Sequence, residues 1–258
     1  MHPNYNVLYL AFARPSGSGG FLTMDVTGYP GGLAQMRSDI ATVRGNGDRV
    51  ILSVGGQTGG LIISSDTMRN NVLTSISNII SDLGQIDGVD WNTFEGRNMG
   101  TAEMDRIIWI SRQLRSSSRY GSNFMITAAP APSRVADKRF CARANSAGVL
   151  SYCAPQFYDV PQDNIQTRYI PDVFLTRSDS WRSYIPANRI VVGLGVRSSG
   201  IGLCLRSGSG CYWTGTQARD GYSNARNTDS SLRGVMNWAA DTDAWIGNPF
   251  ATGAGAVN

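Results

Sequence analysis

Acidic and amide side chains gather in one short stretch of the sequence, residues 85–96. Asp90 and Asn92 are separated by a single residue, and Glu95, one of only two glutamates in the chain, follows shortly after. Because side chains alternate between the two faces of a strand, Asp90 and Asn92 would point the same way. Carboxyl and amide groups placed where a strand meets a loop can donate, accept and orient protons. The stretch therefore predicts a polar site suited to acid–base chemistry.

Strand-like and helix-like segments alternate on both sides of this stretch. Predicted strands cover 5–13, 49–56, 124–130, 150–159, 189–196 and 234–238, and predicted helices cover 33–44, 65–83, 101–118 and 170–184. Alternation of this kind predicts an α/β fold with a parallel sheet and helices outside it. In parallel barrels the active site lies at the carboxyl ends of the strands, which is where Asn92 and Glu95 would fall.

The same stretch resembles a known family. Residues 87–90, Asp-Gly-Val-Asp, match the first half of Asp-Gly-x-Asp-x-Asp-x-Glu, the fourth-strand pattern of glycoside hydrolase family 18, the chitinases and endo-N-acetylglucosaminidases. Asn92 stands at the third Asp of that pattern, Phe94 stands at the catalytic Glu, and Glu95 follows one residue late. Other segments similar to strands of the family are 53–56 (Ser-Val-Gly-Gly), 124–130, 156–159 (Gln-Phe-Tyr-Asp), 189–196 and 234–238 (Gly-Val-Met-Asn-Trp).

The resemblance implies a TIM (β/α)8-type barrel made by residues 1–258 as a single domain. In the family's order these segments would be its second to eighth strands, and only four residues precede Tyr5, where the first of them begins. We therefore expect a barrel whose first strand is lacking or supplied from elsewhere, in a chain that is part of a larger polypeptide or assembly. The segment after Trp238 does not have the pattern of a closing helix.

The resemblance also implies roles for individual residues. In this family the substrate's own N-acetyl oxygen attacks the anomeric carbon while one Glu protonates the leaving group. Glu95 would be that acid, Asn92 would orient the acetamide, and Asp90 would complete the catalytic group. The residues expected to bind substrate are Asp87, Gln156, Tyr158, Asp159, Trp238 and Met125. No cofactor and no metal ion are expected.

Strand geometry leaves the function open. In a regular strand Glu95 would face away from Asp90 and Asn92, and only a β-bulge at residues 93–94 would turn it back. The preferred hypothesis is a catalytically degenerate, chitinase-like barrel that binds a glycan containing N-acetylglucosamine. Such a barrel could be part of a phage tail, as a minor tail protein, or of another surface, and from there recognise a cell-envelope polysaccharide. The alternatives are an active retaining, substrate-assisted hydrolase and a structural barrel without a ligand.

Charge and composition exclude several other classes of partner and site. The net charge is +4, but the arginines are interleaved with Asp, so we expect no nucleic-acid surface. No apolar run approaches the roughly 20 residues that span a bilayer, so we expect no membrane partner. The lone histidine, His2, cannot form a Ser-His-Asp site or a histidine-based metal site.

The four cysteines form two local pairs. We expect a disulfide between Cys204 and Cys211, because residues 206–210 have the composition of a hairpin tip. Cys141 and Cys153 could form a second disulfide or remain buried thiols. Disulfides persist in oxidising compartments, so the pairing predicts an extracellular or virion-surface location.

Overall fold

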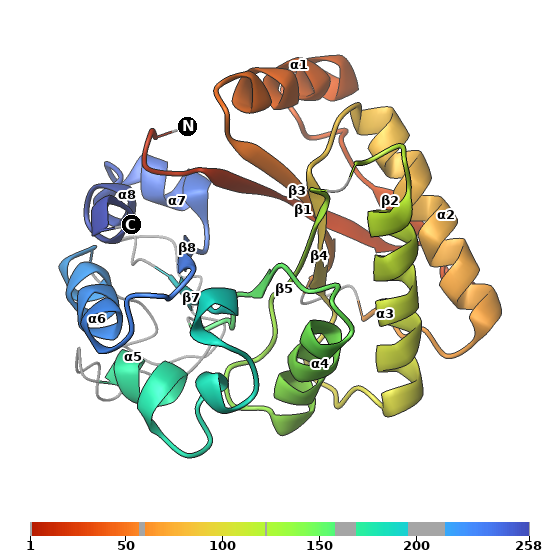
Figure 1. Cartoon of the computed structure of the whole chain (residues 1–258). Coiled ribbons are helices and arrows are strands. Elements are labelled where there is room, and N and C mark those ends of the chain that lie inside the picture. The colour runs from red at the N-terminus through yellow and green to blue at the C-terminus, as the bar shows by residue number, and fades with distance from the viewer. Residues whose placement is uncertain (1, 57–59, 122, 158–168, 196–214, 258) are drawn as a thin grey trace. The chain divides into compact units, whose positions relative to one another are not determined.

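The computed structural model describes residues 2–56, 60–121, 123–157, 169–195 and 215–257, and Figure 1 shows its helices and strands. The chain forms two compact units. The sheet unit comprises Asn6–Pro130 and Arg143–Ser151, and the C-terminal unit comprises Met1–Tyr5, Ala131–Ala142 and Tyr152–Asn258.

In the part of the sheet unit that the structure describes, hydrogen-bonded strands follow the order β2-β1-β3-β4-β5. Their bounds are Val7–Pro15 for β1, Leu22–Met24 for β2, Arg49–Gly55 for β3, Gly88–Asn92 for β4 and Met125–Ala128 for β5. Strands β1, β3, β4 and β5 are parallel to their neighbours, whereas β2 pairs antiparallel with β1. The parallel alternation predicted from the sequence is therefore present in this unit.

Three helices pack beside these strands, and Figure 1 shows α2 and α3 running next to each other along the sheet. Their bounds are Gly32–Gly45 for α1, Asp66–Leu83 for α2 and Thr101–Ser116 for α3. Ser65 caps α2, because its hydroxyl accepts a hydrogen bond from the N–H of Met68 at 3.2 Å. Val72 and Ile76, which lie on the apolar stripe of α2, are fully buried.

The two faces of β4 are distinguished by a hydrogen bond to α3. Trp91 Nε1 donates to Ser111 Oγ at 3.0 Å, and both residues are buried. Trp91 therefore points toward the helices. Because side chains alternate along a strand, Asp90 and Asn92 point to the opposite face of the sheet.

The described residues of the C-terminal unit form three short strands, β6 (Tyr152–Cys153), β7 (Val191–Leu194) and β8 (Gly234–Asn237). Strands β7 and β8 are parallel, with Val191 opposite Gly234 and Leu194 opposite Asn237. Isolated parallel bridges join Cys153 to Ile190 and Gln156 to Gly193. Helix α6 (Gly215–Thr228) contacts both α5 (Tyr169–Pro171) and α8 (Pro249–Thr252).

One prediction for this part of the chain needs correction. The helix expected over residues 170–184 is interrupted: a π-helical turn, Asp172–Thr176, follows α5, and a separate 3₁₀ turn covers Trp181–Ser183. The intervening Arg-Ser-Asp-Ser sequence favours a turn, because short polar side chains bond the nearby backbone. The segment after Trp238 is helical in short pieces, namely α7 (Ala240–Trp245), α8 and a 3₁₀ turn, Ala254–Val257.

Asp243 joins the N-terminal residues to these short helices. Its carboxylate is fully buried and accepts hydrogen bonds from Tyr5 Oη at 2.7 Å, from Phe250 N at 2.8 Å and from Ala251 N at 3.1 Å. Burial, followed by the hydrogen bond to Asp243, raises the pKa of Tyr5. This polar contact gives the helical C-terminal segment a fixed place within its unit.

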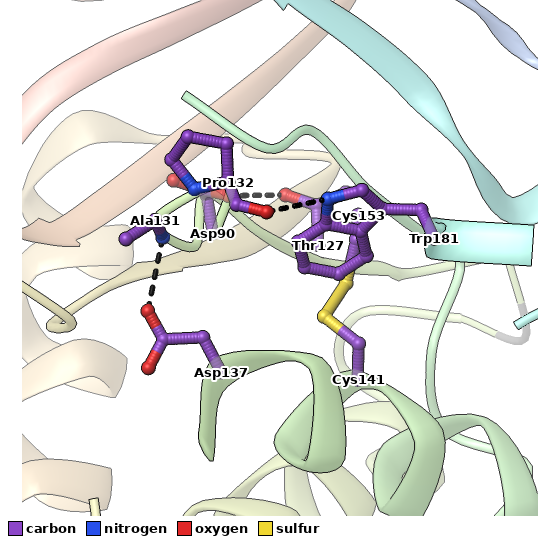
Figure 2. Close-up of a disulfide and its surroundings, with 8 residues drawn as sticks. All are labelled: Asp90, Thr127, Ala131, Pro132, Asp137, Cys141, Cys153 and Trp181. Carbon is purple, nitrogen blue, oxygen red and sulfur yellow. Dashed lines mark hydrogen bonds between the residues drawn. A yellow bond between two sulfur atoms is a disulfide. The ribbon is translucent and has the colours of Figure 1, made fainter. Parts of the chain in front are cut away.

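A disulfide links Cys141 of α4 (Val135–Ser146) to Cys153 of β6, as Figure 2 shows. Both cysteines are fully buried. The pair left open by the sequence is therefore bonded, whereas Cys204 and Cys211, the pair expected to be bonded, lie outside the described residues. Among the described residues, no helix combines the length and apolar character needed to cross a membrane.

Candidate functional site

Asp90 lies at the centre of a row of polar side chains that crosses three parallel strands. The strand register places Ser53 of β3 and Thr127 of β5 directly beside it. Ser53 Oγ donates to Asp90 Oδ2 at 2.8 Å, and Thr127 Oγ1 donates to Asp90 Oδ1 at 2.7 Å, a bond drawn in Figure 2. All three side chains are buried. Each carboxylate oxygen of Asp90 thus has its own hydroxyl donor.

The pKa of Asp90 reflects this enclosure. Burial has the largest effect and raises the pKa of Asp90 to about 6, although the hydrogen bonds from Thr127 and Ser53 oppose that rise. The negative charge of Glu95 raises the pKa of Asp90 further. Glu95 is therefore close enough for its charge to act on the carboxyl group of Asp90.

Glu95 lies beyond the end of the strand, in the turn that follows it. Strand β4 ends at Asn92, and a turn begins at Glu95, so alternation along a strand does not set the direction of Glu95. This differs from the bulge proposed at residues 93–94, because those residues lie beyond the paired part of β4. Phe94 is 1% exposed and belongs to the core, whereas Glu95 is partly exposed.

Asn92 is buried at the carboxyl end of β4, close to the glycine pair that ends β3. Gly56 N donates to Asn92 O at 2.7 Å. A Cβ atom on Gly55, whose φ is +113°, would lie only 2.1 Å from Asn92 O. Gly55 is thus required for the close approach of the two strand ends, which explains the first glycine of the Ser-Val-Gly-Gly segment similar to the family's third strand.

Asp87 lies at the other end of β4. Arg44 Nε donates to it at 2.9 Å, Arg49 Nη1 at 3.2 Å and Val50 N at 2.9 Å. Burial alone would raise the pKa of Asp87, but these hydrogen bonds and the charge of Arg44 hold it below its ordinary value. Met125 is at the same end, where its N–H donates to Asp87 O at 2.8 Å.

This location changes the interpretation of both residues. Four residues along a strand, at roughly 3.3 Å each, separate the start of β4 from its end at Asn92. Asp87 and Met125, which were expected to bind substrate, therefore stand apart from the cluster of Asp90, Asn92 and Glu95. The motif Asp-Gly-x-Asp suggested one site because its residues are close in sequence, but a strand spreads them along its length.

A surface cavity of about 440 Å³ lies at the Asp87 end of the sheet unit. It is lined by α1 and by the turn before β4, including Arg37, Arg44 and Gln85. Arg44 is already bound to Asp87, and Arg37 donates to the backbone carbonyl of Asp82. We assign this cavity no part in the chemistry of Asp90.

The remaining expected site residues belong to the C-terminal unit. Gln156 is buried and forms a parallel bridge with Gly193 of β7. Trp238 follows β8, is partly exposed, and donates from its backbone N–H to Leu194 O at 2.8 Å. Both therefore lie at the carboxyl ends of strands within this unit. Tyr158 and Asp159 lie outside the described residues.

Neither Ser53 nor Thr127 was expected at the site from the sequence. Each lies within a predicted strand, and the only signal was that Ser53 begins the Ser-Val-Gly-Gly segment. Their convergence on Asp90 depends on the register between strands. Within the described ranges, no group of three or more His, Cys, Asp or Glu side chains is arranged to hold a metal ion.

Comparisons with known proteins identify the fold. No family model matches the chain. It is 31% identical over 163 residues to chitinase Chi52 of Paenibacillus xylanexedens, an alignment that covers 58% of this chain and only 28% of Chi52. Among solved structures, a putative chitinase A from Streptomyces coelicolor superimposes on this chain with a TM-score of 0.77 and 21% sequence identity. The superposition covers 99% of this chain and 90% of the Streptomyces coelicolor chain.

A family GH18 chitinase from Chromobacterium violaceum gives a TM-score of 0.74 at 18% identity, over 99% of this chain and 76% of its own. The predicted α/β fold of the TIM-barrel type, in which an incomplete barrel was allowed, is confirmed by these similarities. The chain is therefore a chitinase-like protein with the fold of glycoside hydrolase family 18.

Proposed function

We propose that this protein hydrolyses glycans that contain N-acetylglucosamine, with chitin as the reference substrate. The observation that carries the proposal is the buried carboxyl group of Asp90, bound by Ser53 and Thr127, with the partly exposed Glu95 in the turn after the carboxyl end of β4. The proteins that the chain resembles are named chitinases. The geometry thus favours the active alternative over the degenerate barrel that the sequence alone suggested.

The two carboxyl groups have complementary positions for acid catalysis. Neighbouring carboxyl groups repel each other when both are charged, so the pair holds a proton to a higher pH than an isolated group does. Glu95 is partly open to solvent and can meet a glycosidic oxygen, whereas Asp90 is enclosed by Ser53 and Thr127. Glu95 is the proposed general acid, and Asp90 is its proton partner.

The substrate supplies the nucleophile in this proposal. Its N-acetyl oxygen attacks the anomeric carbon as Glu95 protonates the leaving oxygen, which breaks the glycosidic bond and leaves a cyclic intermediate for water to open. Asn92, at the end of β4, would orient the acetamide through its side-chain amide. Within the C-terminal unit, the partly exposed Trp238 stays a separate prediction from the sequence, as an aromatic face on which a sugar ring would stack.

The test compares the wild type with Glu95→Gln on a fluorogenic chitooligosaccharide. Loss of a positioned general acid typically costs 10²- to 10⁴-fold in rate, so we expect kcat to fall by roughly that factor. Asp82→Asn, a change at an exposed acid on α2, is the matched control and should retain full activity. Equal activity in the wild type and Glu95→Gln would reject Glu95 as the acid.

A second candidate function is a glycan-binding module without activity. It is favoured by Asn92, which replaces a carboxylate of the family pattern, and by buried Phe94, which delays the glutamate by one residue. Calorimetric titration with N-acetylglucosamine oligomers separates the two. Binding without hydrolysis by the wild type supports the binding module, and the absence of both supports a structural barrel.

The setting of the protein remains a prediction. The disulfide between Cys141 and Cys153 supports an oxidising, extracellular location. A cell-envelope glycan as ligand, and a place on a virion within a larger assembly, are hypotheses from the sequence. Binding to purified bacterial cell walls, compared with binding to crystalline chitin, would test the first of them.

A further inference from the structure

Arg97 lies two residues after Glu95, in the segment between β4 and α3. Its Nη1 donates to Glu103 Oε2 at 2.6 Å and its Nη2 donates to Glu103 Oε1 at 2.8 Å. Nη2 also donates to Leu61 O at 2.7 Å, and Nε donates to Thr93 O at 3.0 Å. A guanidinium group presents its donors in a rigid plane, so these four hydrogen bonds together fix its orientation.

Glu103 anchors this arrangement. It lies in the first turn of α3, where a carboxylate is favoured by the helix dipole, and it is buried. Its Oε1 also accepts a hydrogen bond from Ile63 N at 2.9 Å. The Arg97–Glu103 pair therefore joins the segment 61–63, the turn after β4, and α3. We call these contacts the Arg97 clamp.

The clamp closes the turn that carries Glu95. Strand β4 ends at Asn92, so strand geometry does not set the direction of Glu95. The bond from Arg97 Nε to Thr93 O spans this residue, and Gly96, at φ +71°, permits the reversal of the chain between them. The position of the Glu95 carboxylate relative to Asp90 therefore depends on this turn.

We propose that Arg97 is a positioning residue, which holds the turn after β4 so that the Glu95 carboxylate faces Asp90. Arg97 acts through the backbone of Thr93 and does not itself need to touch a substrate. The effect on catalysis rests on the proposed hydrolase function. The effect on the geometry of the two carboxyl groups does not, because the clamp is the same in a hydrolase and in a binding module.

The first test measures the titration of Asp90 without a substrate. Arg97→Lys keeps the positive charge but loses the planar fork. We expect the pKa of Asp90, followed by carbon-13 NMR of the aspartate carboxyl groups, to fall in Arg97→Lys toward its value in Glu95→Gln, because Glu95 moves away. In the Glu95→Gln background, adding Arg97→Lys should cause no further change in the pKa of Asp90.

A matched control is available on α3. Arg115 Nη1 also donates to two backbone carbonyl oxygens, of Gly148 at 3.2 Å and Val149 at 2.9 Å. Arg115→Lys should leave the titration of Asp90 unchanged. Glu103→Gln keeps the shape of the clamp and weakens its fork, so it should shift the pKa of Asp90 in the same direction as Arg97→Lys, and it serves as the test if Arg97→Lys does not fold.

The second test measures hydrolysis. A displacement of about 1 Å in a catalytic group can cost roughly a hundredfold in rate, so kcat of Arg97→Lys should fall by about 10- to 100-fold while KM changes by less than about threefold. A kcat loss of the same size in the Glu95→Gln background would overturn the proposal, because Arg97 would then act independently of Glu95.

The two tests separate this inference from the proposed function. An unchanged titration of Asp90 in both Arg97→Lys and Glu103→Gln overturns the positioning role, whatever the activity. A lowered pKa of Asp90 in these variants, together with a wild type that hydrolyses nothing, upholds the positioning role and rejects the hydrolase proposal.

Discussion

Ser53 and Asp90 occupy the same rung of neighbouring parallel strands, and Ser53 Oγ donates a hydrogen bond to Asp90 Oδ2 at 2.8 Å. The bond stabilises the charged form of Asp90 inside a buried layer of side chains. It therefore opposes the effect of burial, which favours the neutral acid. The balance between these two effects sets the range of pH over which Asp90 exchanges its proton.

Ser53→Ala removes one of the two hydroxyl donors to Asp90. We expect the pKa of Asp90 to rise above its wild-type value, because the charged form loses a hydrogen bond while its burial is unchanged. Carbon-13 NMR of the carboxyl groups measures this directly. Ser111→Ala, which removes the partner of Trp91 on the other face of β4, is the control and should not move the pKa of Asp90.

The raised pKa of Asp90 makes stability depend on pH. Between the ordinary pKa of an aspartate, 3.8, and the folded-state pKa of about 6, the folded protein holds this proton more firmly than the unfolded chain does. The contribution of Asp90 to stability therefore falls as pH rises through that window. The total loss is about 3 kcal/mol, because a roughly hundredfold difference in proton affinity corresponds to that free energy.

Asp90→Asn removes this dependence. Denaturant unfolding at pH 4 and pH 7.5 should show that the stability of the variant relative to the wild type is greater at the higher pH. Ser111→Ala, which does not titrate, should show the same relative stability at both pH values. A difference between the wild type and Asp90→Asn that stays constant from pH 4 to pH 7.5 would contradict the raised pKa.

Asp87→Asn should weaken the fold without disabling the site. Asp87 binds two arginines and the buried N–H of Val50 at the amino-terminal end of β4, and loss of its charge weakens those bonds. We expect the free energy of unfolding to drop by about 1–3 kcal/mol. Glycan binding or hydrolysis per folded molecule should be retained. Loss of either activity in the folded variant would show that Asp87 belongs to the functional site.

The disulfide between Cys141 and Cys153 should stabilise the folded state. It closes a loop with a sequence separation of 12 residues, and constraining a loop of that size in the unfolded chain is worth about 3 kcal/mol. The double variant Cys141→Ala with Cys153→Ala should unfold at a correspondingly lower denaturant concentration. A reductant should cause no further loss of stability from the Cys141–Cys153 disulfide in this variant, because the variant lacks that bond.

Much of the secondary structure could be predicted because it depends on local patterns. The apolar spacing of α2 and its Ser65 cap, and the apolar run of β3 that ends in Gly55, are visible in neighbouring residues. The segment 170–184 was predicted less well, because its apolar residues have helical spacing while its polar residues favour turns. The helical spacing and the turn preference then favour different structures, and the sequence alone does not show which of them prevails in the folded protein.

The candidate site shows the same division. The sequence indicated Asp90, Asn92 and Glu95, because few residue types do acid–base chemistry and these are close together. It did not indicate Ser53, Thr127 or Arg97. Those residues reach the site only through strand register and through an ion pair with Glu103, which are contacts between distant parts of the chain.

By itself, the sequence determined the parallel α/β architecture, the resemblance to family 18 and the acidic stretch after residue 85, because periodicity and motif spacing are local properties. Only the tertiary structure decided which end of β4 Asp87 and Met125 occupy relative to Asn92, and that Glu95 lies in a turn beyond the strand. The physical reason is that a strand separates residues that a motif groups together, whereas the turn that carries Glu95 is held by hydrogen bonds from Arg97 to Glu103 and to Leu61, which lie elsewhere in the sequence.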